Sequence, residues 1–303
     1  MIKSSTGEVC SPNDDIKALD LHGTNALRAR LLQIQADSGS GEAALLAEAD
    51  IAVRADQAAQ AEVEQAAKQA EIDKTKQALS DFRSYLAQST GKAAHDLPED
   101  DELAYTYNPD TQQCEITRLD GAPIDLNISN SDLTGELPLP PQLMVVELYC
   151  SYNQLTSLPE VLPASLTVLN CFKNQLTSLP EQLPASLTDL RCFKNQLTSL
   201  PELLPASLTE LHCSDNQLTS LPEQLPTSLT ELHCSKNQLT SLPEQLPPSL
   251  TKLNCSSNQL TSLPELPTSL TSLDCSSNPD LANNPAAQAA LQAMRDRGGN
   301  VIS

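Results

Sequence analysis

Seven of the nine cysteines of this chain recur at an almost constant interval, and this interval constrains the fold more than any other feature. They occupy positions 150, 171, 192, 213, 234, 255 and 275, so successive cysteines are 21 residues apart, except for a last interval of 20. A disulfide framework or a zinc cluster would show paired or irregular spacings, and CxxC pairs are absent. One cysteine per sequence repeat instead predicts a solenoid of short, stacked coils.

Each repeat carries the same set of apolar positions around its cysteine. A representative repeat reads Leu187-x-x-Leu190-x-Cys192-x-x-Asn195-x-Leu197. We expect Leu190 and Cys192 to alternate on a short strand and to point inward. The amide of Asn195 can satisfy backbone groups between neighbouring coils where the chain turns. A Leu-Pro-Glu-x-Leu-Pro segment follows, and because proline fixes φ and lacks an N–H, this segment predicts an extended, polyproline-like return path in place of a helix.

The recurring cysteines should lie beside one another in a buried column, because parallel strands in register are about 4.8 Å apart. Side chains that project in parallel have poor geometry for a disulfide, and each thiol has two equivalent neighbours. We therefore expect reduced cysteines that act as packing residues. Such thiols fit the bacterial cytoplasm or, for a secreted protein, the interior of a host cell.

The repeats cover about residues 125–278, are 20 to 21 residues long and carry Leu-Pro-Glu-x-Leu-Pro on the return path. In these features they resemble the bacterial LPX-type leucine-rich repeat proteins, which include the YopM-like and IpaH-like secreted effectors. The resemblance implies a curved solenoid with a protein-binding concave face and, often, delivery into a host cell by type III secretion. IpaH-like members also carry a C-terminal ubiquitin-ligase domain with a catalytic cysteine. No cysteine follows Cys275 in this sequence, so we expect the solenoid without that activity.

The predicted fold class is α+β. We expect a right-handed leucine-rich-repeat solenoid with a parallel β-sheet on its concave face and an extended, polyproline-like convex side, preceded by an α-helical region. Residues 1–100 would form the Ala-rich helical region with an acidic linker at residues 95–102, residues 101–280 the solenoid with an N-terminal β-hairpin cap, and residues 281–303 a capping helix.

Both ends of the solenoid need covering, and the flanking sequences supply candidates. Two strand-like segments on either side of Asn108-Pro109-Asp110-Thr111 predict a β-hairpin, and a degenerate first coil follows it. At the other end, Asn284-Pro285 predicts the start of a helix and Gly298-Gly299 its end.

Residues 42–89 contain neither Pro nor Gly and are dense in Ala, Glu, Gln and Lys. They predict one long helix or a broken pair, with an earlier helix over about residues 27–36. The apolar stripe of the long helix is weak, and it suits either an Ala-rich coiled coil that makes a homo-oligomer or packing against the solenoid. Its members are Leu45, Ala49, Ala52, Ala59, Val63, Ala66, Ala70, Leu79, Phe82 and Leu86.

The repeats are nearly identical except at the positions that flank the inward residues of each strand, and these positions should point to the concave surface. Exposed aromatic and Arg side chains near the middle of such a face are plausible anchors for a partner. Phe172 and Phe193 could also serve only to cover each other. The predicted partner-binding residues are Tyr149, Asn170, Phe172, Asp189, Arg191, Phe193, Glu210, His212, Glu231 and His233.

Composition excludes several other functions. A formal net charge of −21 argues against nucleic acid and anionic membranes as partners. The sequence contains no run of about 18 apolar residues, which a membrane-spanning helix would require. Nucleophile-elbow and phosphate-loop motifs are absent, so we predict neither enzyme activity nor a cofactor.

Two histidines raise the question of a metal site. His212 and His233 should lie on adjacent strands beside Glu210 and Glu231. Zinc prefers three or four ligands at fixed geometry, and acidic side chains at alternate strand positions can splay away from it. We therefore predict no metal, with a pH-sensitive contact as a further option.

The sequence thus predicts a non-catalytic module that binds a partner protein through the concave face, as a bacterial secreted effector would. The alternative is a structural or receptor-binding component of a surface or phage-like assembly. In that case the N-terminal helix would build an oligomeric stalk and the solenoid would project from it.

Overall fold

The computed structural model describes residues 42–89, 97–108, 113–120 and 122–303. The chain divides into two compact units, Met1–Ala70 and Glu71–Ser303, and helix α3 (Glu42–Ser89) contributes to both. Several predicted features lie outside the described residues, namely the helix expected over residues 27–36, Cys10, the first part of the acidic linker and most of the hairpin turn.

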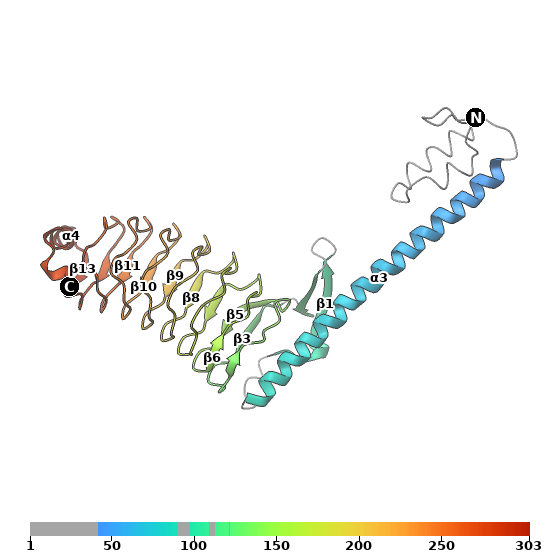
Figure 1. The fold of residues 1–303 in the computed structure, drawn as a ribbon, viewed down its shortest axis with the longest axis horizontal. Coiled ribbons are helices and arrows are strands. Elements are labelled where there is room, and N and C mark those ends of the chain that lie inside the picture. The colour runs from blue at the N-terminus through green and yellow to red at the C-terminus, as the bar shows by residue number, and fades with distance from the viewer. Residues whose placement is uncertain (1–41, 90–96, 109–112, 121) are drawn as a thin grey trace. The chain divides into compact units, whose positions relative to one another are not determined.

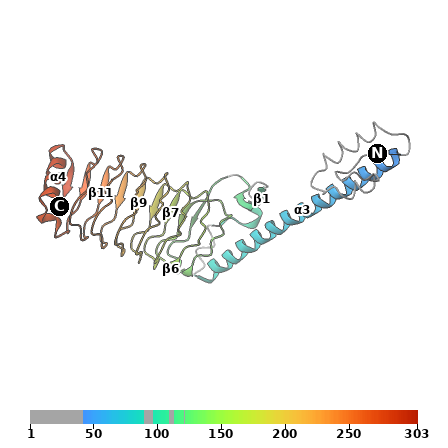
Figure 2. The same cartoon turned by 45° about the horizontal axis from the view of Figure 1, so that its top comes forward.

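A nine-stranded parallel sheet organises the second unit, and each coil of the solenoid adds one short strand to it (Figures 1 and 2). The sheet runs in the order β13-β12-β11-β10-β9-β8-β7-β5-β3. Corresponding residues of adjacent repeats are paired, as Leu190 is with Leu211. The strands are β3 (Ile124–Asn127), β5 (Val145–Tyr149), β7 (Val168–Asn170), β8 (Asp189–Arg191), β9 (Glu210–His212), β10 (Glu231–His233), β11 (Lys252–Asn254), β12 (Ser272–Asp274) and β13 (Asn300–Ile302). The leucine-rich-repeat solenoid predicted from the sequence is thereby confirmed.

The interior of each coil is built from leucine and cysteine, as the repeat pattern predicts. Leu190 and Cys192 are fully buried, and the same holds for their counterparts in the neighbouring coils. The seven recurring cysteines are buried and free, so they fill small positions in the core without forming disulfides. Burial raises the pKa of these thiols, to about 12 for Cys150 and Cys213 and to about 11 for Cys275.

The recurring asparagines join each coil to the preceding one. The Nδ2 of Asn195 donates to the carbonyl oxygens of Cys171 and Cys192, at 3.1 and 3.0 Å. Its Oδ1 accepts from the backbone N–H of Leu176 at 3.1 Å. One side chain thus satisfies three backbone groups, which confirms the predicted role of the asparagines.

No helix occurs between residues 158 and 271, all of which the structure describes, so the proline-rich segments return without a helix, as predicted, through a series of bends and turns. Two short strands, β4 (Thr134–Glu136) and β6 (Gln154–Ser157), pair beside the first coils. The residue before each recurring asparagine has a positive φ, as in Lys173 (55°) and Lys194 (56°). Its backbone N–H bonds to the next coil, which holds this unfavourable conformation in place.

An antiparallel hairpin of β1 (Leu103–Asn108) and β2 (Gln113–Arg118) precedes the first coil, as predicted, and a short 3-10 helix, η2 (Asp100–Glu102), leads into it. Leu79, Phe82 and Leu86 of α3 are buried in the same core. The hydroxyl of Tyr85 donates to the carbonyl oxygen of Thr134 at 3.1 Å. Of the two arrangements left open for α3, its C-terminal part therefore packs within the solenoid unit.

The acidic segment before the hairpin is more than a linker in its described part, because Leu97 is buried. Arg83 donates to the carbonyl oxygen of Pro98 and pairs with Asp100 at 3.1 Å. None of the helices among the described residues combines the length and the apolarity that crossing a membrane requires.

The C-terminal end is closed by a 3-10 helix, η3 (Leu281–Asn283), and by α4 (Pro285–Asp296). Asn284 caps α4 by accepting from the backbone N–H groups of Ala286 and Ala287. Gly298 then adopts a φ of 85°, where glycine is favoured, and the chain turns back. Strand β13 was not predicted from the sequence; it pairs in parallel with β12 and extends the sheet by one strand.

Candidate binding face of the parallel sheet

The predicted partner-binding residues lie on the exposed face of the sheet. In strands β7 to β10 and in β12 the central residue is buried and its two neighbours are half-buried on the opposite face. The last residues of consecutive strands are paired in register, which places Tyr149, Asn170, Arg191, His212 and His233 in one row. The register of the coils therefore assembles this row from residues about 21 positions apart.

An aromatic cluster lies just beyond the row, at the residues where the chain leaves the strands. The rings of Phe172 and Phe193 are stacked, with centroids 4.3 Å apart and planes 8° from parallel. Tyr152 meets Phe172 edge-on at 4.9 Å, and the Nζ of Lys173 lies 4.4 Å from the centre of the Tyr152 ring. The two phenylalanines remain half-buried, so their stack is in part open to a partner.

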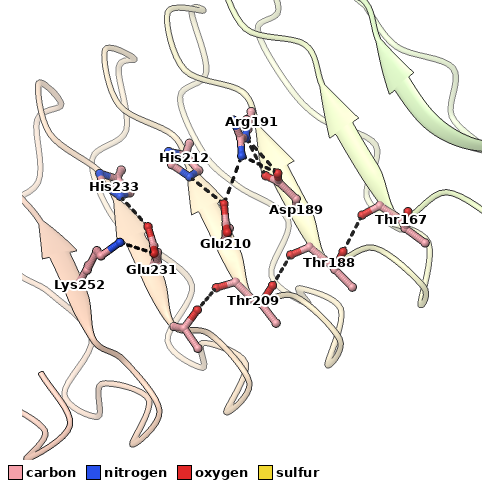
Figure 3. A network of polar contacts seen from close by, with 11 residues as sticks. Thr167, Thr188, Asp189, Arg191, Thr209, Glu210, His212, Glu231, His233 and Lys252 are labelled. Carbon is pink, nitrogen blue, oxygen red and sulfur yellow. Dashed lines mark hydrogen bonds and ion pairs between the residues drawn. The ribbon is translucent and has the colours of Figure 1, made fainter. Parts of the chain in front are cut away.

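A ladder of charged side chains crosses the middle of the face (Figure 3). The Nε of Arg191 lies 3.0 Å from both carboxylate oxygens of Asp189, and its second terminal nitrogen reaches Glu210 at 3.3 Å. On β10, Glu231 accepts from the Nζ of Lys252 at 2.6 Å. Hydrogen bonding to Asp189 raises the pKa of Arg191, and hydrogen bonding to Lys252 lowers the pKa of Glu231, so both groups stay charged at neutral pH.

His212 and His233 form a second stacked pair on the same face. Their ring centroids are 4.4 Å apart and their planes differ by 6°. The Nε2 of His212 lies 3.5 Å from an oxygen of Glu210, and that of His233 lies 3.6 Å from an oxygen of Glu231. Both distances exceed an ordinary hydrogen bond, and both Nε2 atoms are buried without a hydrogen-bond partner. Burial, with the neighbouring His233 and Arg191, lowers the pKa of His212, which is therefore neutral at pH 7.

The first members of the row are polar. The hydroxyl of Tyr149 donates to Glu147 at 2.6 Å, and this bond raises the pKa of Tyr149 to about 12. The Oδ1 of Asn170 is buried without a hydrogen-bond partner. Tyr149 is thus directed along its own strand toward the carboxylate.

Some residues that the structure places on this face were not among those predicted from the sequence. Tyr152 was overlooked, although it replaces the Lys, Asp or Ser found at the same position of the other repeats. Lys252 and Glu147 were also left out, and both neutralise or orient predicted residues. A search for repeat positions where residue type changes would have found Tyr152.

Two groups on the face have donor atoms suited to a metal ion. In one, His212, Glu231 and His233 bring one ligand atom each to within 4.8 Å of one another, and in the other Asp189, Glu210 and His212 do the same. The acidic side chains therefore lie close to the imidazoles. The prediction of no metal had rested on the opposite expectation, that they splay away. The second group is engaged by Arg191, which contacts both of its carboxylates.

Comparison with known proteins gives relatives for the repeats. Residues 207–227 and 249–270 match the family model described as Leucine Rich Repeat. None of the curated proteins matches the chain significantly. YopM from Yersinia enterocolitica WA-314 is 46% identical over 50% of this chain and 33% of that chain, with a TM-score of 0.47.

Two further solved structures are similar to the chain in sequence. YopM from Yersinia pestis, described as a leucine-rich effector protein, is 40% identical over 51% of this chain and 43% of that chain, with a TM-score of 0.47. A Shigella effector LRR domain is 28% identical over 59% of this chain and 80% of that chain, with a TM-score of 0.39. The chain spans less than half the length of the YopM chains that it matches. The repeats, the stacked parallel coils and the family match together give this chain a leucine-rich-repeat solenoid, whose repeats are similar in sequence to those of YopM.

Proposed function

We propose that the exposed face of the sheet, the concave face in leucine-rich-repeat geometry, binds a partner protein and that the chain catalyses no reaction. The observation that carries this proposal is the placement of sequence variation. Core leucines, cysteines and asparagines repeat almost unchanged, whereas the stacked phenylalanines and the charged ladder occupy only the exposed positions. A scaffold that holds constant while one face varies is how repeat proteins encode a binding surface.

The chemistry of the face suits a protein surface. Aromatic and Arg side chains contribute most to binding energy at interfaces, and here Phe172, Phe193 and Arg191 are adjacent and held by their neighbours. Such preorganisation lowers the entropy cost of binding. Carboxylates of Glu147, Asp189, Glu210 and Glu231 occupy the same register position across their strands, which favours a partner segment with Lys or Arg.

The test is capture of partners by matched triple variants. The face variant carries Phe172→Ala, Arg191→Ala and Phe193→Ala. The control carries Glu181→Ala, Glu202→Ala and Glu223→Ala, which change exposed residues of the return path. Quantitative mass spectrometry would compare proteins captured from bacterial and host-cell lysates by the wild-type chain and by both variants.

We expect the face variant to lose a partner that the control retains, with affinity weaker by roughly 30-fold or more, as for loss of a hot spot. Thermal melting must show that both variants are folded. Equal capture of every partner by the two variants would overturn the proposal.

We further propose that the protein acts inside a host cell after secretion. Its support is the sequence similarity to YopM, which is described as an effector, and the absence of disulfides among the described cysteines. A fusion to a reporter that is active only in the host cytosol tests this directly. Signal from infected cells that depends on the secretion apparatus is expected, and its absence would contradict the proposal.

A second function, self-association through α3, is favoured by the exposure of its first half. Ile51 and Val63 are 66% and 70% exposed, unlike the buried apolar residues at the other end of the helix. Ala52, Ala59 and Ala66 recur every seven residues, which suits a coiled coil. Light scattering on the intact chain and on a Val63→Glu variant would separate an oligomer from a monomer, and a monomeric wild-type chain would refute this function.

A further inference from the structure

We propose that His212, His233 and Glu231 form a binding site for a divalent transition-metal ion of the zinc class. The site goes beyond the binding of a partner protein and does not depend on it. Two strands supply it, with one histidine at the end of β9 and the other histidine and the glutamate on β10 (Figure 3). The register of the sheet, which pairs His212 with His233, brings the three side chains together.

Distances between the donor atoms fit a compact metal site. Each of the three residues offers one ligand atom within 4.8 Å of the other two, and the Nε2 of His233 is 3.6 Å from a carboxylate oxygen of Glu231. In a tetrahedral zinc site with bonds of about 2.0 to 2.2 Å, neighbouring ligand atoms are roughly 3.4 Å apart. The separation between His233 and Glu231 is therefore close to that of two ligands of one ion and longer than an ordinary hydrogen bond.

The imidazole nitrogens lack the partners that buried polar atoms normally have. The Nε2 atoms of His212 and His233 are both buried, and neither has a hydrogen-bond partner. Leaving a buried polar group unsatisfied is unfavourable, and such groups call for a ligand, an ion or a water. Each of these nitrogens lies near a carboxylate, that of His212 near Glu210 and that of His233 near Glu231, so donor atoms of the kind that a metal ion requires are gathered here.

The surrounding charges support a cation at this point. Lys252 bonds to one oxygen of Glu231 at 2.6 Å, which orients the carboxylate and leaves its second oxygen toward His233. Asp189, Glu210 and Glu231 carry three negative charges, whereas Arg191 and Lys252 carry two positive ones. These five charged side chains therefore sum to a net negative charge. Glu210, at 3.5 Å from His212, stabilises the ion from outside the ligand set.

Binding of a metal ion must change the stack of the two imidazole rings. Parallel imidazoles direct their lone pairs along parallel lines, so a shared ion requires the rings to turn out of the stack. Both side chains are partly exposed, at 22% and 30%, which leaves them room to rotate. Two imidazoles and one carboxylate favour Zn²⁺, Co²⁺, Ni²⁺ or Cu²⁺ over Mg²⁺ and Ca²⁺, and the fourth position would be filled by water or by a donor of a partner.

The experiment is a titration of the intact, untagged chain with Co²⁺ and Zn²⁺. Cys10→Ser is introduced in all samples, because this cysteine lies off the repeat positions. Co²⁺ in a tetrahedral site gives visible absorption, and Zn²⁺ binding is measured by calorimetry. We expect one ion per chain, together with selective shifts of the His212 and His233 imidazole resonances in nuclear magnetic resonance spectra.

Variants separate the site from adventitious binding. His212→Ala, His233→Ala and Glu231→Gln should each weaken binding at least 100-fold, beyond the roughly 10- to 100-fold effect of losing an outer partner. His22→Ala and His95→Ala serve as matched controls and should bind as the wild-type chain does. Circular dichroism checks that the variants fold. Binding that is absent, or that persists unchanged in the His212 and His233 variants, would overturn the site.

Discussion

At the scale of single residues, the recurring asparagines hold adjacent coils together through hydrogen bonds to the backbone. Each one bonds to backbone groups of its own coil and of the coil before it, so it replaces hydrogen bonds that a helix or a longer strand would supply elsewhere. Sequence spacing was enough to predict this role, because an Asn recurs at the turn of every coil and its amide carries two donors and an acceptor.

We expect Asn195→Ala to lower the free energy of unfolding by about 3 kcal/mol or more. Three backbone groups would lose their partner, and each unsatisfied buried group costs about 1 to 3 kcal/mol. Urea unfolding measures the change. Gln196→Ala, at the neighbouring exposed position, is the control and should alter stability by less than about 0.5 kcal/mol. Equal effects of the two variants would contradict the role assigned to Asn195.

The residue scale also shows what spacing cannot predict. Tyr149 bonds to Glu147 on its own strand, and Arg191 pairs with Asp189 and Glu210. These pairings depend on side-chain rotamers in a crowded row, which no repeat pattern specifies.

At the scale of elements, the cysteine column is a continuous row of neutral thiols inside the coils. Burial raises the pKa of each thiol, and neighbouring thiols add to the effect for Cys171 and Cys192. The folded state therefore keeps protons that the unfolded chain releases above about pH 9. Stability from the neutral thiols is complete below that pH and is lost as pH rises toward the folded pKa values, which reach about 12.

We expect the column to make the protein sensitive to alkali. Above about pH 9 each buried thiol should lower the free energy of unfolding by about 1.4 kcal/mol per pH unit. A Cys192→Ala variant loses packing at every pH but titrates one thiol fewer. Its stability deficit relative to the wild-type chain should therefore shrink as pH rises from 9 to 10.5 in denaturant titrations. A deficit that stays constant over this range would show that the thiol is already ionised or accessible.

The backbone of the coils also departs from what the sequence indicated. Pro and Asn were expected to shape the turns, yet the left-handed residue is the one before each asparagine, such as Lys194 or Asp215. Asp tolerates a positive φ better than most residues, but Lys has no such preference, so at Lys194 the conformation is imposed by the bond to the next coil. Strand β13 is a similar case, because a three-residue strand forms only where an open sheet edge is available.

At the scale of the whole molecule, the solenoid unit depends on its end pieces, because each coil contacts only its neighbours. Phe82 of α3 is completely buried with Leu79 and Leu86, and the hairpin of β1 and β2 adds Cys114 and Ile116 to the buried residues. A quasi-one-dimensional core should therefore lose stability locally when an end piece is damaged.

We expect Phe82→Ala to destabilise the unit by about 3 to 5 kcal/mol, as for loss of a large buried side chain. Hydrogen exchange should show the loss of protection first in β3 and β5, and much less in β9 to β11. Glu64→Ala, at an exposed position of the same helix, should change neither. A uniform loss of protection along all coils would show that the solenoid unfolds as one cooperative block.

The sequence by itself determined the repeat length, the inward leucines and cysteines, the asparagine bonds, the helix-free return path and the two end pieces. These features follow from local spacing, and every coil repeats the same local problem. Only the tertiary structure decided that Tyr152 meets the ring of Phe172, that Arg191 reaches Glu210 on the next strand, and that the end of α3 is buried. The physical reason is that these contacts join residues on different coils or elements, so they exist only once register and packing have fixed which side chains meet.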